Sequence, residues 1–272
     1  MRRAYTGRVR RAALVACLVC GADAEASAQS PAPPAAAVAT APTFLTRADL
    51  TFVWARFVTS DPRFAWDAQV EVDIDVLDTR KWRMNFDAHY DAVLGHERRT
   101  FDLNQGSYIL DGTIGKRFGP QRFEIAFLAR HVSRHLVDRQ NAPAISWNLA
   151  GVRASHRVAV GRTTIDGRLD FGHAMQTWFV DYTWMTEVRL TATRPIDSRL
   201  DFVSEATGVL VNVDHLERSR RACGGRIEGA LRLKGAAAAV DLVAGYERRV
   251  DAFPTDRFRV RTFTLGFRFV SR

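Results

Sequence analysis

The sequence of 272 residues carries 39 Lys and Arg against 30 Asp and Glu, which gives a formal net charge of +9. No recognition helix or aromatic and basic platform accompanies this positive charge, so we expect no nucleic-acid partner. No segment reaches the roughly 18 consecutive apolar residues of a membrane-spanning helix, which excludes an α-helical membrane protein.

Residues 1–28 have the organisation of a secretory signal peptide. The basic stretch MRRAYTGRVRR precedes the apolar run AALVACLVCGA, and Ala26-Ser27-Ala28 supplies the small residues at which signal peptidase cuts. We therefore predict export, with cleavage near Ala28. The segment LVAC leaves open an alternative in which Cys17 is lipidated.

Residues 29–46 are rich in Ala and Pro and nearly without charge, so we predict a disordered spacer there. Cleavage of the signal removes Cys17 and Cys20 and leaves only Cys223. A single cysteine excludes an internal disulfide and a cysteine-based zinc site, and we predict neither a metal nor a cofactor. The folded domain is predicted over residues 47–272.

That domain alternates apolar and polar residues, the pattern of β-strands whose two faces meet different environments. In WDAQVEVDIDVL, apolar residues alternate with acidic and amide residues that include Asp73 and Asp75. The run WRMNFDAHYDAVL repeats the pattern, with Asp87 and Asp91 on its polar parity. We count 12 such runs, within a range of 10 to 14, each about 10–14 residues long.

Short and longer connections alternate between these runs, which is the pattern of an antiparallel transmembrane β-barrel. Arg or Lys facing lipid at the bilayer midplane costs about 2–4 kcal/mol, so the charged parity must line the lumen. The predicted lumen charges include Asp73, Asp75, Asp87, Asp91, Arg226 and Arg232. We expect the acidic second and third strands to pair across the barrel with arginines of the tenth and twelfth.

The opposite parity is apolar and is expected to face lipid, with aromatic residues near the strand ends forming interfacial girdles. These aromatic residues are Trp66, Trp82, Tyr90, Trp147, Tyr182 and Trp184.

The signal peptide, the amphipathic runs and the C-terminal FTLGFRF together resemble a Gram-negative outer-membrane β-barrel protein. The resemblance implies a place in the cell outer membrane, among phospholipid and lipopolysaccharide. It also implies recognition by the barrel-assembly machinery, which reads alternating apolar and aromatic residues near the C-terminus. The matching residues are Phe263, Leu265, Phe267 and Phe269. The chain departs from that signal by ending in Arg272, and the resemblance names no activity.

The segment RHVSRHLVDRQN places His131, Ser133 and His135 on the lipid-facing parity at the end of a predicted strand. Our primary interpretation is a polar strand end in a non-enzymatic protein. That protein would be a narrow pore or a structural component with a charged lumen, because side chains fill much of a barrel of about 12 strands.

The alternative is an outer-membrane lipid hydrolase. His131-Val132-Ser133 resembles the start of the His-x-Ser-Asn motif of outer-membrane phospholipase A and lipid A deacylase, although Arg134 stands where those families have Asn. The resemblance implies that His131 is the base and Ser133 the nucleophile of a serine-dependent ester hydrolysis.

Other residues in or near this segment are further candidates for the site. Asp138 or Asn148 could orient His131 in the hydrolase reading. HVSRHLVD also resembles a His-x-Ser-x-His-Leu-x-Asp pattern found in outer-membrane barrels with no assigned activity. That second resemblance implies that His135 and Asp138 belong to the site as ligand-binding or orienting residues.

Overall fold

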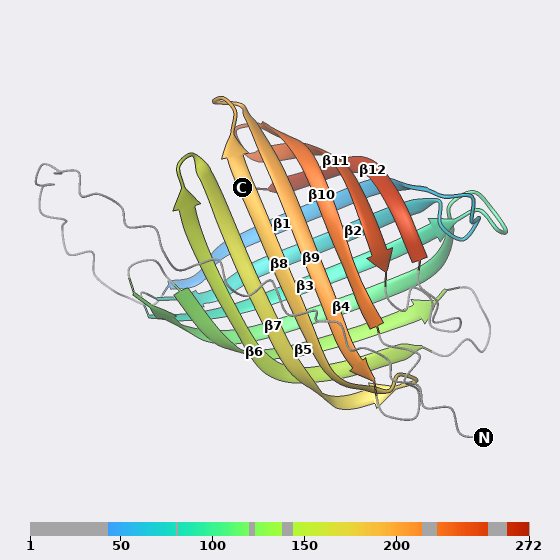
Figure 1. Cartoon of the computed structure of the whole chain (residues 1–272), viewed down its shortest axis with the longest axis horizontal. Helices are drawn as coiled ribbons and strands as arrows, with labels where there is room; N and C mark the ends of the chain where they lie inside the picture. The colour runs from blue at the N-terminus through green and yellow to red at the C-terminus, as the bar shows by residue number, and fades with distance from the viewer. Residues whose placement is uncertain are drawn as a thin grey trace, which may run out of the picture. The chain divides into compact units, whose positions relative to one another are not determined.

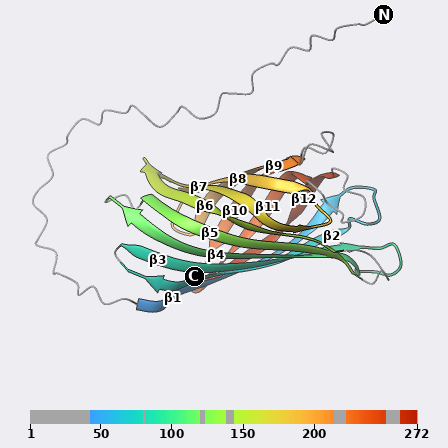
Figure 2. The same ribbon diagram turned by 90° about the horizontal axis from the view of Figure 1, so that it is seen from below.

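The structure, a computed structural model, describes residues 43–272 except 80, 120–122, 138–143, 214–221, 250–259 and 272. The predicted signal peptide and most of the predicted spacer lie outside the described residues. Within them, no helix is long and apolar enough to cross a membrane. Twelve antiparallel strands form a closed barrel in which each strand pairs with its chain neighbours and β1 pairs with β12. Figures 1 and 2 show these strands running obliquely around a continuous wall. The predicted architecture and strand number are confirmed.

The strands are β1 (Thr43–Val58), β2 (Trp66–Asp78), β3 (Trp82–Gly95), β4 (Asp102–Phe118), β5 (Phe123–Leu136), β6 (Ile145–Val160), β7 (Thr163–Trp178), β8 (Tyr182–Pro195), β9 (Leu200–Val213), β10 (Ala222–Lys234), β11 (Ala238–Arg249) and β12 (Val260–Ser271). Strand β1 thus begins before the predicted domain limit at residue 47.

The two ends of the barrel carry different connections. The connections that follow β2, β4, β6, β8 and β10 have two to four residues, and we call this the short-turn end. Those that follow the odd-numbered strands have three to ten residues and define the long-loop end. The shortest of them is 179–181, because β7 continues to Trp178.

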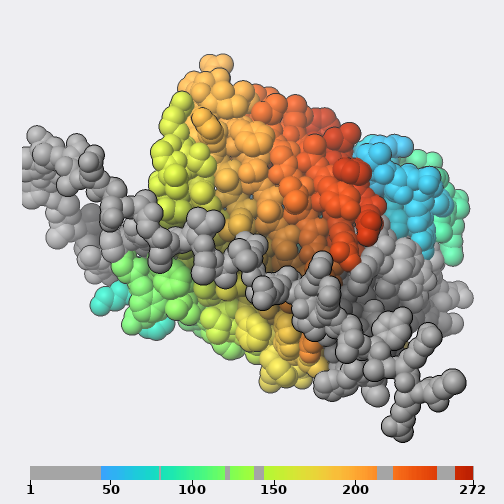
Figure 3. Space-filling view, viewed as in Figure 1, coloured from blue at the N-terminus to red at the C-terminus, as the bar shows by residue number. Residues whose placement is uncertain are grey.

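The outer face of the wall is apolar. Many large side chains on the outward parity are 40–66% exposed. They include Phe86, Ile114, Phe127, Val152, Phe171, Leu231 and Ile227. Figure 3 shows the strands coloured yellow to red forming one continuous face. An apolar surface that encircles a protein far exceeds the few hundred Å² that soluble monomers expose, and it matches a lipid-facing band.

The lumen is charged, as the alternation predicts. Asp75 pairs with Arg83 at 2.6 Å, and Asp73 pairs with Arg47 at 2.7 Å. On the other side of the barrel, Arg232 pairs with Asp241 at 2.7 Å. All three contacts join neighbouring strands. The prediction that these charges pair across the barrel was therefore wrong for them.

The other predicted lumen charges follow two patterns. Arg226 lies 2.5 Å from Glu228 on its own strand. Asp91 is reached by Arg249 of β11 at 3.2 Å, a contact that spans β12, β1 and β2. Asp87 lines a lumen cavity.

Apolar side chains fill part of the lumen at the long-loop end. Trp147 and Tyr182 are 4% and 8% exposed and pack edge to face at 5.0 Å between ring centroids. Placing these two rings in a lipid-facing girdle was therefore wrong. Tyr182 lies at an irregularity in the β8–β9 pairing, between Tyr182 and Trp184, which breaks the simple alternation. Along β6, Asn148 lies on the same outward parity as the exposed Val152. Because side chains alternate along a strand, its neighbour Trp147 faces inward.

Candidate active site on the outer face

Strand β5 turns its polar C-terminal half outward. Phe123, Ile125 and Phe127 are exposed on the outer face, whereas Leu128 and Arg130 are buried in the lumen. Because side chains alternate along a strand, the outward parity continues through positions 131, 133 and 135. The segment therefore lies on the lipid-facing side of the wall, near the long-loop end.

Ser133 contacts His135. The Oγ of Ser133 lies 2.7 Å from Nε2 of His135, within hydrogen-bond distance. The ring of His135 also meets Tyr108 of β4 edge to face, at 6.0 Å between centroids, and Tyr108 packs against Tyr90 at 4.8 Å. Ser133 is 8% exposed although it faces outward, so neighbouring side chains rather than lipid surround its hydroxyl.

His131 contacts Asn148 instead. The Nδ1 of His131 lies 2.7 Å from Oδ1 of Asn148 on β6, and Nδ2 of Asn148 donates to Oε1 of Gln176 on β7 at 3.1 Å. Because Nδ2 of Asn148 donates, its Oδ1 is the acceptor and Nδ1 of His131 carries the proton. In a neutral imidazole, Nε2 of His131 is then the ring nitrogen with the lone pair, which is the form that a general base needs.

The structure thus brings together one hydroxyl, two imidazoles and an amide pair on three adjacent strands. Of the residues singled out from the sequence, Asn148 reaches His131, and His135 rather than His131 reaches Ser133. Asp138 lies outside the described residues. Sequence reasoning missed Gln176 and Tyr108. Gln176 joins the site because a register shift in the β6–β7 pairing places it opposite Asn148.

Arg134, the residue that departs from the His-x-Ser-Asn motif, takes no part in this surface. Its guanidinium lies 5.6 Å from the centre of the Trp147 ring, which packs inside the barrel. Position 134 has the inward parity, so the residue there does not reach Ser133 on the outer face. The departure at Arg134 therefore weighs less against a hydrolase than the sequence suggested.

The surroundings of the site are those of a lipid boundary. Leu110 of β4 stands opposite His131, and two outward rows nearer the short-turn end Ile114, Phe127 and Val152 lie side by side. All four are 40–57% exposed. Among the described residues, no group of three or more His, Cys, Asp or Glu side chains could hold a metal ion.

Neither a protein-family profile nor a curated protein matches the sequence. The fold is similar to an outer-membrane channel from Pseudomonas putida F1, with TM-score 0.55, 11% identity and coverage of 89% of this chain and 99% of that one. It is also similar to the outer-membrane phospholipase of Salmonella typhi, solved as a dimer with bound calcium, with TM-score 0.52, 8% identity and coverage of 87% and 94%. At these identities the likeness concerns the fold alone. The protein has the fold of an outer-membrane β-barrel.

Proposed function

We propose that this protein is an outer-membrane lipid hydrolase that cleaves acyl esters at the outer face of its barrel. The observation that carries the proposal is the 2.7 Å contact between Ser133 and His135 on a surface that otherwise faces lipid. A polar strand end needs no such pairing, because near the membrane interface a polar side chain costs only about 0–1 kcal/mol. Nucleophile and base within hydrogen-bond reach are the signature of an activated serine.

The reaction follows from the contacts. The Oγ of Ser133 attacks the ester carbonyl of an acyl chain while its proton passes to Nε2 of His135. The resulting imidazolium returns the proton to the departing alcohol, and the acyl group stays on Ser133. Water, activated by the same imidazole, then releases the fatty acid and restores the hydroxyl. His131, held by Asn148, offers a second base beside the serine.

The substrate class follows from the surroundings of the site. A water-soluble ester would have to reach a hydroxyl on the outside of the wall, on a face whose exposed side chains, such as Leu110, are apolar. A membrane lipid is already there, with its ester groups at the interface and its chains along the barrel. Phospholipid and lipid A both meet this description.

The non-enzymatic interpretation makes the opposite prediction, so one experiment separates the two. The full chain, refolded in vesicles or detergent, is incubated with phospholipid or lipid A, and released fatty acid is measured by mass spectrometry. We expect release from the wild type and a loss of roughly 10³-fold or more in Ser133→Ala. The matched control is Ser204→Ala on the outward parity of β9, which we expect to retain full activity.

A shift in electrophoretic mobility on heating confirms that each variant forms a barrel. A folded wild-type barrel that releases no fatty acid, with or without calcium, would contradict the hydrolase. The protein would then be a non-enzymatic barrel.

A further inference from the structure

The described residues form two lumen cavities, of about 370 and about 420 Å³. The smaller one, the long-loop cavity, extends to Arg249, the last residue of β11. The larger one, the short-turn cavity, is lined near its end by Asp78 and Arg157. Only Arg168 and Arg189 line both cavities. Among the described residues, these two side chains therefore lie at the boundary between the cavities, and we call them the separating layer.

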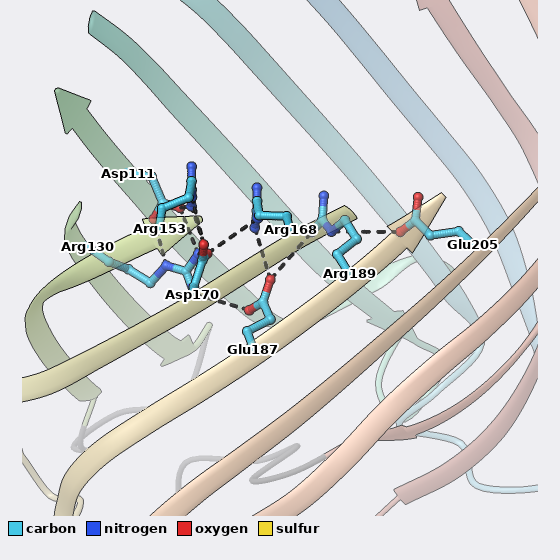
Figure 4. A network of polar contacts seen from close by, with 8 residues as sticks. All are labelled: Asp111, Arg130, Arg153, Arg168, Asp170, Glu187, Arg189 and Glu205. Atoms are coloured by element: carbon cyan, nitrogen blue, oxygen red, sulfur yellow. Dashed lines mark hydrogen bonds and ion pairs between the residues drawn. The ribbon is translucent and has the colours of Figure 1, made fainter. Parts of the chain in front are cut away.

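Figure 4 shows what holds this layer. At one end of the network, Arg130 donates to both carboxylate oxygens of Asp111 at 2.7 Å and to Asp170 at 2.8 Å. Such short, bidentate contacts fix a guanidinium firmly.

The contacts loosen toward the separating layer. Arg168 lies 3.0 Å from Glu187, but Arg189 stands 3.8 Å from Glu187 and 3.9 Å from Glu205. The side chain of Arg189 is 32% exposed, whereas that of Arg130 is 4% exposed. The layer is thus made from the least tightly held arginines of the network, and their guanidinium groups extend into the open part of the lumen.

The opposite wall favours this extended position. Glu71 of β2 and Asp87 of β3 line the long-loop cavity together with Arg168 and Arg189. Neither carboxylate forms an ion pair with another described residue. The carboxylate of Glu71 attracts the two guanidinium groups across the cavity, in an interior where charges are screened weakly.

We infer that the lumen is a path for small ions that is closed at a single side-chain layer, the guanidinium groups of Arg168 and Arg189. The two cavities are already lined by charged groups that replace water around an ion. Removing the layer would join the two cavities into one. This function of the lumen is independent of hydrolysis on the outer face.

The test is the conductance of the purified, refolded full chain in planar lipid bilayers. We expect the wild type to give no channel steps above background, and Arg168→Ala/Arg189→Ala to give discrete steps. Arg157→Ala serves as the matched control, because Arg157 lines only the short-turn cavity and should leave the barrel closed. Heat modifiability again establishes folding.

If the double alanine variant does not fold, a second variant tests the same inference. Arg189→Cys, in a Cys223→Ser background, shortens one side chain and introduces a thiol at the layer. We expect it to conduct and to close again when a bulky methanethiosulfonate reagent is added. Wild-type steps as large as those of the variants would overturn the inference. So would folded variants that stay silent, or a cysteine variant whose current the reagent does not change.

Discussion

On the outer face of the barrel, the hydroxyl of Ser133 lies 2.7 Å from Nε2 of His135, two residues farther along β5. Residues two apart on a strand share a face, so a single strand presents both the hydroxyl and the imidazole that we propose as nucleophile and base. His131 shares that face on the other side of Ser133 but is held by Asn148 at 2.7 Å. The site therefore has two imidazoles with different partners, and their roles can be separated by experiment.

We expect His135 to be the base that contacts the nucleophile. His135→Gln should lower kcat by about 10²–10⁴-fold, the usual contribution of general base catalysis. Asn148→Ala, which loosens only His131, should cost less. His173→Gln on the outward parity of β7 is the matched control. The reverse order, with His135→Gln active and His131→Gln inactive, would make His131 the base, as the motif resemblance implies.

Arg130 should be a major determinant of barrel stability. It is 5% exposed and contacts Asp111, Asp170 and Glu187. Arg130→Ala leaves these buried carboxylates without one of their cations, which typically costs about 3–5 kcal/mol. Arg157→Ala removes a pair whose arginine is 72% exposed and should cost about 0–1 kcal/mol. Urea unfolding in lipid vesicles measures both, and equal losses would contradict the account.

Two glycines of the wall should respond differently to alanine. A Cβ at Gly151 would collide with the backbone of β7 at Phe171 and Gly172, whereas one at Gly112 would meet nothing within 4 Å. We expect Gly151→Ala to lower the free energy of unfolding by about 1–3 kcal/mol and Gly112→Ala to leave it nearly unchanged. The urea midpoints of the two variants check this. Coinciding midpoints would contradict the expectation, because they would mean that the backbone of β7 moves aside without loss of stability.

The stability that the connection between β1 and β2 gives to the folded barrel should depend on pH. The guanidinium and backbone N–H of Arg63 donate to the carboxylate of Asp61 and lower its pKa below the usual value. A lowered pKa stabilises the folded state above the unfolded pKa, and this contribution disappears as pH falls through the folded pKa. The Tm difference between wild type and Asp61→Asn should therefore be present at neutral pH and vanish in acid. A difference that is constant with pH would contradict this.

The alternation of the sequence was sufficient to predict the strands, their number and the face on which the histidines lie. It predicts these because a strand with two different environments must alternate. The same rule misplaced Trp147 and Tyr182. An aromatic ring near a strand end fits either face, and the irregular pairing at Tyr182 changes the parity on which the prediction depends.

The site was less predictable than the fold. Both imidazoles lie two residues from Ser133, so periodicity alone does not choose between them. The contact between His131 and Asn148 depends on the register of β5 against β6, which pairs these two residues directly. Gln176 enters through a register shift that leaves no recognisable mark in the sequence. The contacts of Asn148 and Gln176 are therefore decided by the register between strands, which the residue types alone do not predict.

The central claim is that Ser133 is a nucleophile, and covalent labelling tests it most directly. The refolded full chain is treated with a lipid-like fluorophosphonate, and the adduct is located by mass spectrometry of its peptides. We expect one adduct per chain, on Ser133, and its loss in both Ser133→Ala and His135→Gln. An unlabelled folded barrel, or equal labelling of Ser133→Ala, would contradict the account.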